Sequence, residues 1–190
     1  MRSKQKFNIP LDEFINLSLY NKDHGYYMKK NPFGKKGDFT TAPNISRLFS
    51  EMIAVWTVSF WQNLGSPKNF NLIELGAGNG EMMKTLIESF KNFPNFVNAC
   101  NIFIHEKSTT LIKIQKKKLR GNKVNWLSDF NKLKKIPSIF IANEFFDSIA
   151  IKQFIKLENS WFERFVRIES NNNAFFFDKK FNIKNLEKKI

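Results

Sequence analysis

The spacing of hydrophobic residues changes near residue 70 of this chain. Before that point, apolar residues recur every three or four positions, which predicts helices over residues 10–19 and 45–64. Glycine and proline punctuate the segment between them, residues 20–38, which predicts a loop. We expect the large apolar residues of the second helix to lie in the core: Ile45, Leu48, Phe49, Met52, Ile53, Trp56, Phe60, Trp61 and Leu64.

After residue 70, short apolar segments alternate with helical ones. The pattern predicts a parallel sheet, because a strand followed by a helix returns the chain to the same edge of the sheet. Ser108 is placed to cap the second of the two helices. The predicted strands are 71–75, 101–105, 124–127 and 138–142, and the predicted helices are 82–90 and 109–119.

The last part of the chain has three further strand patterns, over residues 151–156, 161–168 and 174–177. Polar turns at 158–159 and 171–173 separate them, which predicts antiparallel pairing. The fold class is therefore α/β, with a Rossmann-like parallel sheet, flanking helices, an N-terminal helical cap and a C-terminal antiparallel β-meander. We divide the chain into a cap with a substrate-side loop (1–70), a βαβ core (71–150) and the antiparallel strands (151–190).

The formal charge of +14 would ordinarily point to nucleic acid or an anionic membrane. Most of the positive residues are lysine, and asparagine, isoleucine and phenylalanine are also abundant, as an AT-rich genome would produce. Arginine, the residue of bidentate phosphate and base recognition, is scarce, so nucleic acid is not the expected partner.

Cysteine content and hydropathy bear on the compartment. The single cysteine, Cys100, excludes an intramolecular disulfide and fits a reducing compartment. No apolar run is long enough for a membrane span, and the first residues lack the core of a signal peptide. We expect a cytoplasmic protein, and we predict no metal site.

The segment LIELGAGNG, residues 72–80, carries the strongest local signal. Gly76, Gly78 and Gly80 follow a predicted strand and open a helix, where free backbone N–H groups can bind an anion. A dinucleotide-binding turn would place its third glycine at position 81, which is Glu81 here. The spacing, with Glu74 two residues earlier, resembles the first motif of S-adenosylmethionine-dependent methyltransferases. A tight turn without a ligand is the alternative.

Two acidic residues follow the next predicted strands. Glu106 ends the second strand, where one carboxylate can accept both hydroxyl groups of a ribose. Asp129 follows the third strand and could accept from the adenine amino group, although a loop acid without a role is equally compatible with its position.

The segment NEFFD, residues 143–147, follows the fourth predicted strand. Ligands of such sheets lie across the carboxyl ends of the strands, so this segment should face the transferable methyl group. Amino-group methyltransferases often have Asn/Asp-Pro-Pro-aromatic there, and this chain keeps the asparagine and the rings without the prolines. The acids suit an arginine guanidinium, so Asn143, Glu144 and Asp147 are our catalytic candidates.

Three segments together resemble the MidA-type family, which includes a mitochondrial assembly factor for respiratory complex I. They are PFGKKGDFTTAPNISRLF (32–49), LIELGAGNG (72–80) and ANEFFDS (142–148). The resemblance implies a class I methyltransferase fold, S-adenosyl-L-methionine as cofactor, and methylation of a protein arginine, with a complex I core subunit as target. The mitochondrial matrix is implied if the source is eukaryotic.

The same resemblance marks other features of the chain. Asp38 lies in the first family block and could face the methyl donor or the substrate, or belong to a loop that only caps the sheet. Asn44 stands where the family usually has glutamate. Family members have further strands after this point, which predicts an incomplete sheet here. A non-catalytic assembly protein that retains a relic cofactor pocket is the alternative function.

Overall fold

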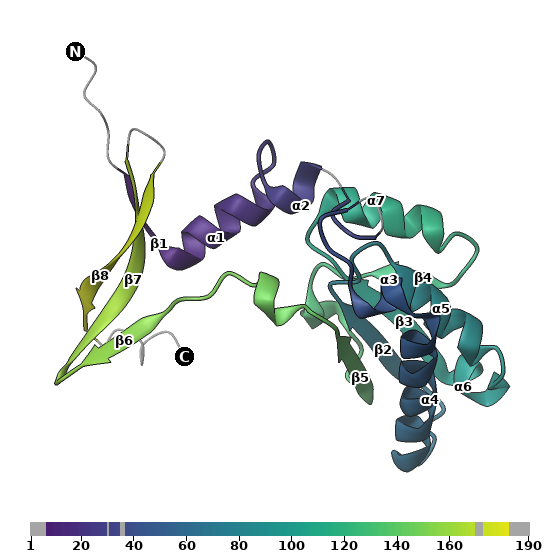
Figure 1. Ribbon diagram of the computed structural model, residues 1–190. Helices are drawn as coiled ribbons and strands as arrows, with labels where there is room; N and C mark the ends of the chain where they lie inside the picture. Colours follow the sequence, from purple (N-terminus) through teal and green to yellow (C-terminus); the bar gives the residue numbers. More distant parts are fainter. Residues whose placement is uncertain (1–6, 30, 35–36, 170–172, 183–190) are drawn as a thin grey trace. The chain divides into compact units, whose positions relative to one another are not determined.

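The computed structural model describes residues 7–29, 31–34, 37–169 and 173–182. The chain forms two compact units, one of residues 26–147 and one of residues 1–25 with 148–190. Each unit contains its own sheet, parallel in the first and antiparallel in the second (Figure 1). The division of the chain into domains 1–70, 71–150 and 151–190 remains a prediction.

The unit of residues 26–147 is built on four parallel strands in the order β4-β3-β2-β5. The chain passes outward from β2 to β4 and then returns to the other side of β2 to form β5, so the strand order reverses between β2 and β5. Such a reversal opens a crevice at the carboxyl ends of the two strands. The strands are β2 (Phe70–Leu75), β3 (Cys100–His105), β4 (Val124–Trp126) and β5 (Ser138–Ala142), which confirms the predicted parallel sheet.

The helices of this unit follow the predicted pattern with three additions. The Ser108 hydroxyl accepts a hydrogen bond from the Leu111 N–H at 3.1 Å, which confirms the predicted helix cap. Three helices, α2, α3 and α6, were not predicted because each is too short to show a periodic pattern. The helices are α2 (Tyr26–Lys29), α3 (Ala42–Ile45), α4 (Arg47–Asn63), α5 (Glu81–Phe90), α6 (Pro94–Ala99) and α7 (Thr109–Lys118), with 3-10 turns η1 (Phe130–Lys132) and η2 (Phe146–Ser148).

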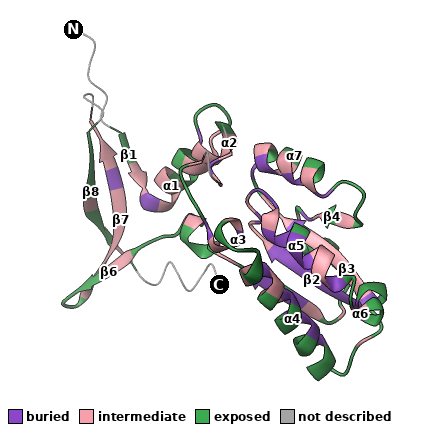
Figure 2. Cartoon of the chain, turned by 45° about the vertical axis from the view of Figure 1, so that its right-hand side comes forward, coloured by how far each residue is buried: buried purple, intermediate pink, exposed green. Residues whose placement is uncertain are grey.

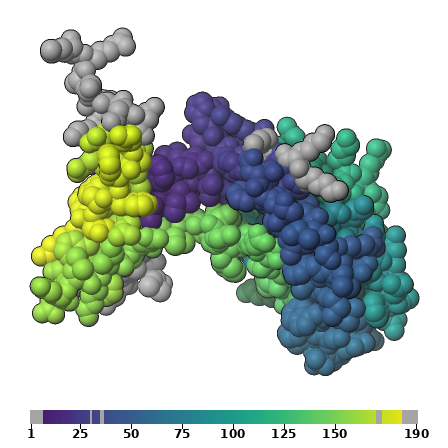
Figure 3. All heavy atoms as spheres, viewed as in Figure 1, coloured from purple at the N-terminus to yellow at the C-terminus, as the bar shows by residue number. Residues whose placement is uncertain are grey.

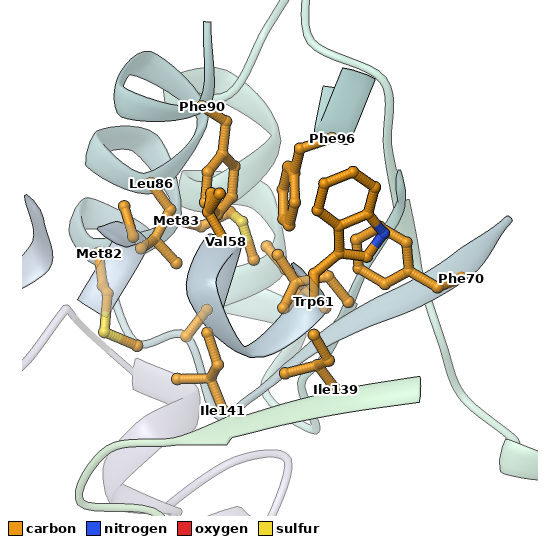
Figure 4. Packing of buried hydrophobic residues seen from close by; sticks show 14 of the residues in the cluster. Val58, Trp61, Phe70, Met82, Met83, Leu86, Phe90, Phe96, Ile139 and Ile141 are labelled. Carbon is orange, nitrogen blue, oxygen red and sulfur yellow. The ribbon is translucent and has the colours of Figure 1, made fainter. Parts of the chain in front are cut away.

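The core of this unit lies between the parallel sheet and helices α4, α5 and α6 (Figure 4). The Phe96 ring lies 5.1 Å from the Phe70 ring and 4.5 Å from the Phe90 ring, measured between centroids. All three rings are almost fully buried, and each such side chain contributes roughly 1.5–3 kcal/mol by leaving water. The core therefore fixes β2, whose end carries the predicted site.

Helix α4 corrects our prediction that its large apolar residues all lie in the core. Its buried face consists mainly of smaller residues, with Ser50 and Ala54 fully buried, and the opposite side is exposed (Figure 2). Apolar residues surround more than half of the helix, so one face cannot bury them all. The outward row, named here the α4 ridge, is Leu48 (63% exposed), Met52 (59%), Trp56 (51%), Phe60 (39%) and Leu64 (47%).

The unit of residues 1–25 and 148–190 contains an antiparallel sheet around β7 (Ser160–Ile168). One edge of β7 pairs with β1 (Phe7–Pro10) and β6 (Phe154–Leu157), and the other edge pairs with β8 (Ala174–Phe181). This confirms the C-terminal antiparallel strands and the turn at 158–159. Strand β1 was not predicted, since it is short and its partner lies far along the sequence.

Helix α1 (Leu11–Tyr20) follows β1 directly, close to its predicted bounds. The predicted turn at 171–173 lies mostly outside the described residues. Within the described part of the chain, no helix has the length and apolar character needed to cross a membrane.

Candidate cofactor pocket and active site

The glycine turn between β2 and α5 adopts a backbone that other residues rarely adopt. Gly76, Gly78 and Gly80 have φ angles of 66°, 53° and 77°, in the left-handed region. The Gly76 N–H donates to the His105 carbonyl at 2.9 Å, which ties the turn to the end of β3. Glycine is favoured at these three positions because it adopts a positive φ without strain. The turn leads directly into the N-terminus of α5, where free N–H groups can bind an anion.

Two aromatic rings lie close to this turn. A Cβ atom on Gly76 would lie 2.6 Å from Cδ2 of Phe145, closer than real contacts allow. A Cβ atom on Gly78 would lie 3.3 Å from the Phe33 ring. Because glycine has no side chain, an aromatic ring or a ligand can lie directly against the backbone at these two positions.

Glu74 is the most unusual polar residue of the site. Its side chain is buried, and its Oε2 atom has no hydrogen-bond partner among the described residues. Burial, and then the nearby charge of Glu106, raise the pKa of Glu74 to about 8. A buried acceptor without a partner is costly, and a cation with N–H donors would satisfy it. An amino-acid ammonium group, such as that of S-adenosylmethionine, has this chemistry.

A small pocket of about 40 Å³ opens beside Glu74. It brings together five of the predicted site residues, Glu74, Gly76, Gly78, Asn143 and Glu144. The end of β5 therefore meets the glycine turn, as expected from the strand reversal between β2 and β5. The other lining residues are Phe33, Thr41, Pro43, Asn44, Ala77, Asn79, Glu81 and Met82.

Glu106 lies at the end of β3, outside this pocket lining, and its carboxylate is held on both oxygens. Its Oε1 accepts from the Ser108 N–H at 2.9 Å, and its Oε2 accepts from Nε2 of Gln115 at 3.2 Å. Burial raises the pKa of Glu106, and these hydrogen bonds partly oppose the rise. The carboxylate is therefore oriented, with lone pairs left for further donors.

Gln115 of α7 connects Glu106 to the glycine turn, and the sequence reasoning missed it. It is fully buried, and its Nε2 also donates to the Gly78 carbonyl at 2.8 Å. Its Oε1 accepts from Nε1 of Trp126 at 2.8 Å. The signal was present: Gln115 is a polar residue at the buried helical spacing of Leu111 and Leu119. An amide at a core position of a helix needs polar partners, and here these are site elements.

The NEFFD segment shows backbone strain at its second residue. Glu144 has a φ angle of 48°, which costs a residue with a Cβ about 1–2 kcal/mol. Strain of this kind persists where the surroundings hold it, often at functional sites. Asn143 is partly buried in the pocket, whereas Asp147 is exposed in the η2 turn.

Three other predicted residues lie away from the pocket lining. Asp38 is exposed and accepts a hydrogen bond from the Tyr26 hydroxyl at 2.5 Å. Asp129 caps η1 by accepting from the Asn131 N–H at 2.9 Å. Gly80 closes the glycine turn against Gln115.

A second network that the sequence reasoning missed ties the 41–44 segment to the glycine turn. Nδ2 of Asn79 donates to Oδ1 of Asn44 at 2.8 Å, and Nδ2 of Asn44 donates to the Thr41 hydroxyl at 2.9 Å. Asn44 thus acts through its amide, as a link between α3 and the pocket floor. Among the described residues, no three histidine, cysteine or acidic side chains gather in the way that a metal ion requires.

Comparison with known proteins agrees with this geometry. A family profile described as "Putative S-adenosyl-L-methionine-dependent methyltransferase" matches residues 52–190. The chain belongs to this family. The match confirms the family resemblance and the cofactor class drawn from the motifs.

Curated relatives are named protein arginine methyltransferase NDUFAF7, mitochondrial. The chain is 32% identical to the Xenopus laevis protein over 185 residues and 31% identical to the human one, with 85% of this chain and 42% of each relative covered. It therefore spans less than half the length of these relatives. A COG1565 superfamily structure from Burkholderia thailandensis, bound to S-adenosyl-homocysteine, matches with a TM-score of 0.75 at 24% identity, covering 95% of this chain and 48% of that one. This match confirms the fold.

Proposed function

We propose that this chain binds S-adenosyl-L-methionine at the carboxyl ends of β2, β3 and β5 and takes part in methylating a protein arginine. The observation that carries the proposal is the buried Oε2 atom of Glu74, which has no hydrogen-bond partner among the described residues and lies beside a glycine-lined pocket. The family match and the names of the relatives support the same activity. They favour it over a non-catalytic relic, because the pocket retains its glycines and its acids.

Each predicted cofactor residue has a role in this proposal. Glu74 accepts the ammonium group, and the backbone of Gly76, Gly78 and Gly80 accommodates the methionine part. Glu106 accepts the ribose hydroxyl groups, and Asp129 accepts from the adenine amino group. The cofactor, when bound, supplies an activated methyl group next to the NEFFD segment.

The residues of the NEFFD segment position the target nitrogen. Asn143 and Glu144 both line the pocket, and a carboxylate such as that of Glu144 can orient a guanidinium group. Methyl transfer needs little more than a correctly placed lone pair, and positioning alone can supply roughly 7–11 kcal/mol. Asp147 and Asp38 are both exposed, which places them where they can contact a protein substrate.

The finer substrate assignment rests on the resemblance. We propose symmetric dimethylation of an arginine on a complex I core subunit, in the cytoplasm of a bacterium or in the mitochondrial matrix of a eukaryote. Support comes from the mitochondrial relatives, which are named as arginine methyltransferases.

The test is incubation of the chain with methyl-labelled cofactor and a cell extract, followed by mass spectrometry of the labelled material. We expect label on a protein arginine with the native chain and none with Glu144→Gln, which should still bind S-adenosyl-homocysteine. Label on RNA would replace the proposal by nucleic-acid methylation. Cofactor binding without any transfer would support a non-catalytic role, and equal turnover by Glu144→Gln would remove that residue from the mechanism.

A further inference from the structure

The hydrogen bonds between the glycine turn and the 41–44 segment run in one direction. The Glu81 N–H donates to Oδ1 of Asn79 at 3.2 Å, which leaves the amide nitrogen of Asn79 as the donor toward Asn44. Asn44 therefore presents its oxygen to Asn79 and its nitrogen to Thr41, whose hydroxyl oxygen accepts at 2.9 Å. Each amide accepts once and donates once. The chain of hydrogen bonds thus ends at the proton of the Thr41 hydroxyl.

Thr41 lines the pocket beside Glu74, and only 8% of its surface is exposed. Residues 38–40, directly before it, are exposed, and Figure 3 shows this segment, in dark blue, at the surface of the molecule. Among the residues that the structure describes, none accepts the proton of the Thr41 hydroxyl. A buried donor needs an acceptor, and in this pocket a ligand can supply one.

The same pocket contains a group with the opposite requirement. Oε2 of Glu74 is a buried acceptor that has no hydrogen-bond partner in the described part of the chain. Two other acids line the pocket: Glu144, which the proposed function assigns to the target nitrogen, and Glu81, whose charge is offset by Nζ of Lys118 at 2.5 Å. The pocket therefore offers a ligand one free acid and one free hydroxyl donor.

An α-amino acid has one group for each of these partners. Its ammonium group donates and carries positive charge, which suits Glu74, and its carboxylate accepts, which suits Thr41. Both groups are bonded to the same carbon atom, so their partners must lie in one small space. A pocket of about 40 Å³ has room for such a head group and not for a nucleoside.

The first turn of α5 adds donors beside the same pocket. The helix begins at Glu81, and the N–H groups of a first turn have no partner within their own helix. Gly78, Asn79 and Met82, which surround this helix start, all line the pocket. The partial positive charge of the helix end favours a carboxylate there.

We propose that the Thr41 hydroxyl donates a hydrogen bond to the carboxylate of the cofactor's amino-acid part, while Glu74 accepts from the ammonium group of that part. Asn44 and Asn79 are positioning residues, because their hydrogen bonds direct the Thr41 proton away from Asn44 and toward the ligand. The inference deepens the proposed function and rests on it. It makes Thr41 a residue that selects a cofactor with a free carboxylate.

The test compares two ligands that differ only in this carboxylate, S-adenosyl-L-methionine and its decarboxylated form. Calorimetric titration of the full chain gives both affinities, and their ratio cancels effects that are common to the two ligands. Thr41→Val keeps nearly the same shape and removes the hydroxyl. We expect it to weaken binding of S-adenosyl-L-methionine by about 10-fold, since the lost hydrogen bond is to a charged group. Binding of the decarboxylated form should change by less than about 2-fold, because it has no carboxylate to lose.

Two control variants separate the hydroxyl from general effects on packing. Thr57→Val makes the same chemical change at a fully buried threonine of α4, whose hydroxyl donates to the Ile53 carbonyl and which does not line the pocket. Thr41→Ser keeps the hydroxyl. Both should retain the native ratio of affinities. Melting curves show whether each variant is folded, and Thr41→Cys replaces an unfolded Thr41→Val, because a thiol is only a weak donor.

The outcomes distinguish this inference from the proposed function. A folded Thr41→Val chain with the native ratio would overturn the inference and leave the proposed cofactor site standing. A ratio that falls as far in Thr41→Ser or Thr57→Val would also overturn it, since the hydroxyl at position 41 would not be the cause. A native chain that binds neither ligand would contradict the proposed function, and the inference with it.

Discussion

The ends of β2 and β3 each place one glutamate near the pocket, buried Glu74 and half-buried Glu106, and the two carboxylates differ in their partners. Glu106 is held on both oxygens by a backbone N–H and an amide, before any ligand is present. Glu74 has an oxygen with no hydrogen-bond partner among the described residues, and its pKa is raised to about 8. The carboxylate at the end of β3 is therefore preorganised, whereas the one at the end of β2 is not. Under the proposed function, this difference gives Glu106 a role in rigid positioning and Glu74 a role in cation recognition.

The largest predicted effect comes from neutralising the unpartnered acid. Glu74→Gln should weaken binding of S-adenosyl-homocysteine by about 100-fold or more, because a buried ammonium would lose its counter-charge. The same change should leave thermal stability unchanged or raise it, since a buried ionisable group is removed. Calorimetric titration and a melting curve measure the two effects. Affinity within a few fold of the native value would contradict a role of Glu74 in cation recognition.

Removing the amide that holds the other acid should act on both binding and folding. Gln115→Leu deletes its hydrogen bonds to Gly78, Glu106 and Trp126, so we expect a loss of about 2–3 kcal/mol of stability and about 10-fold weaker cofactor binding. Chemical denaturation and calorimetry provide the numbers. Lys113→Leu, on the exposed side of the same helix, is the matched control. If a folded Gln115→Leu chain bound S-adenosyl-homocysteine with the native affinity, the proposed contact between Glu106 and the cofactor would be contradicted.

The raised pKa of Glu74 makes a prediction about pH. The folded chain keeps this proton up to about pH 8, whereas the ordinary value of 4.5 applies after unfolding. The protonated form therefore favours folding below pH 4.5, and that contribution is lost as the pH rises through 8. Between pH 4.5 and 8, the free energy of unfolding of the native chain should therefore fall relative to that of Glu74→Gln, by at most about 1.4 kcal/mol per pH unit. Denaturation at a series of pH values measures this difference. Parallel pH profiles would show that Glu74 titrates normally.

The smallest effect concerns the strained residue of the NEFFD segment. Glu144→Gly should raise stability by less than about 1 kcal/mol, because glycine adopts the positive φ freely but has more freedom when unfolded. Glu158→Gly is the matched control, since Glu158 has a similar φ of 50° but lies in the turn between β6 and β7 and does not line the pocket. Both variants should gain stability, and only Glu144→Gly should lose methylation. Equal methylation by both would place Glu144 outside the active site.

Sequence reasoning located the strands of the parallel sheet because each is a short apolar run bounded by clear turn residues. It located the glycine turn for a related reason, since three alternating glycines directly after a strand are typical of a ligand-binding turn. It missed β1, whose pairing with β7 depends on a segment more than 150 residues away. Local patterns do not contain such contacts.

The site was predicted in part, and the missed residues share a property. Gln115 and Asn79, and the amide of Asn44 whose position had been noted, act through hydrogen bonds to other elements, so their roles depend on where the helices pack. The exposure of the α4 ridge was missed because helical periodicity shows which residues share a face but not which face is covered. The sequence also could not show that Glu74 and Glu106 would differ in hydrogen bonding.

The most direct test of the central claim is a crystal structure of the chain bound to S-adenosyl-homocysteine. The account predicts that the ammonium group of the ligand lies within hydrogen-bond distance of Oε2 of Glu74, and that both ribose hydroxyl groups contact Glu106. A ligand bound elsewhere, or one that leaves Glu74 without a partner, would contradict it.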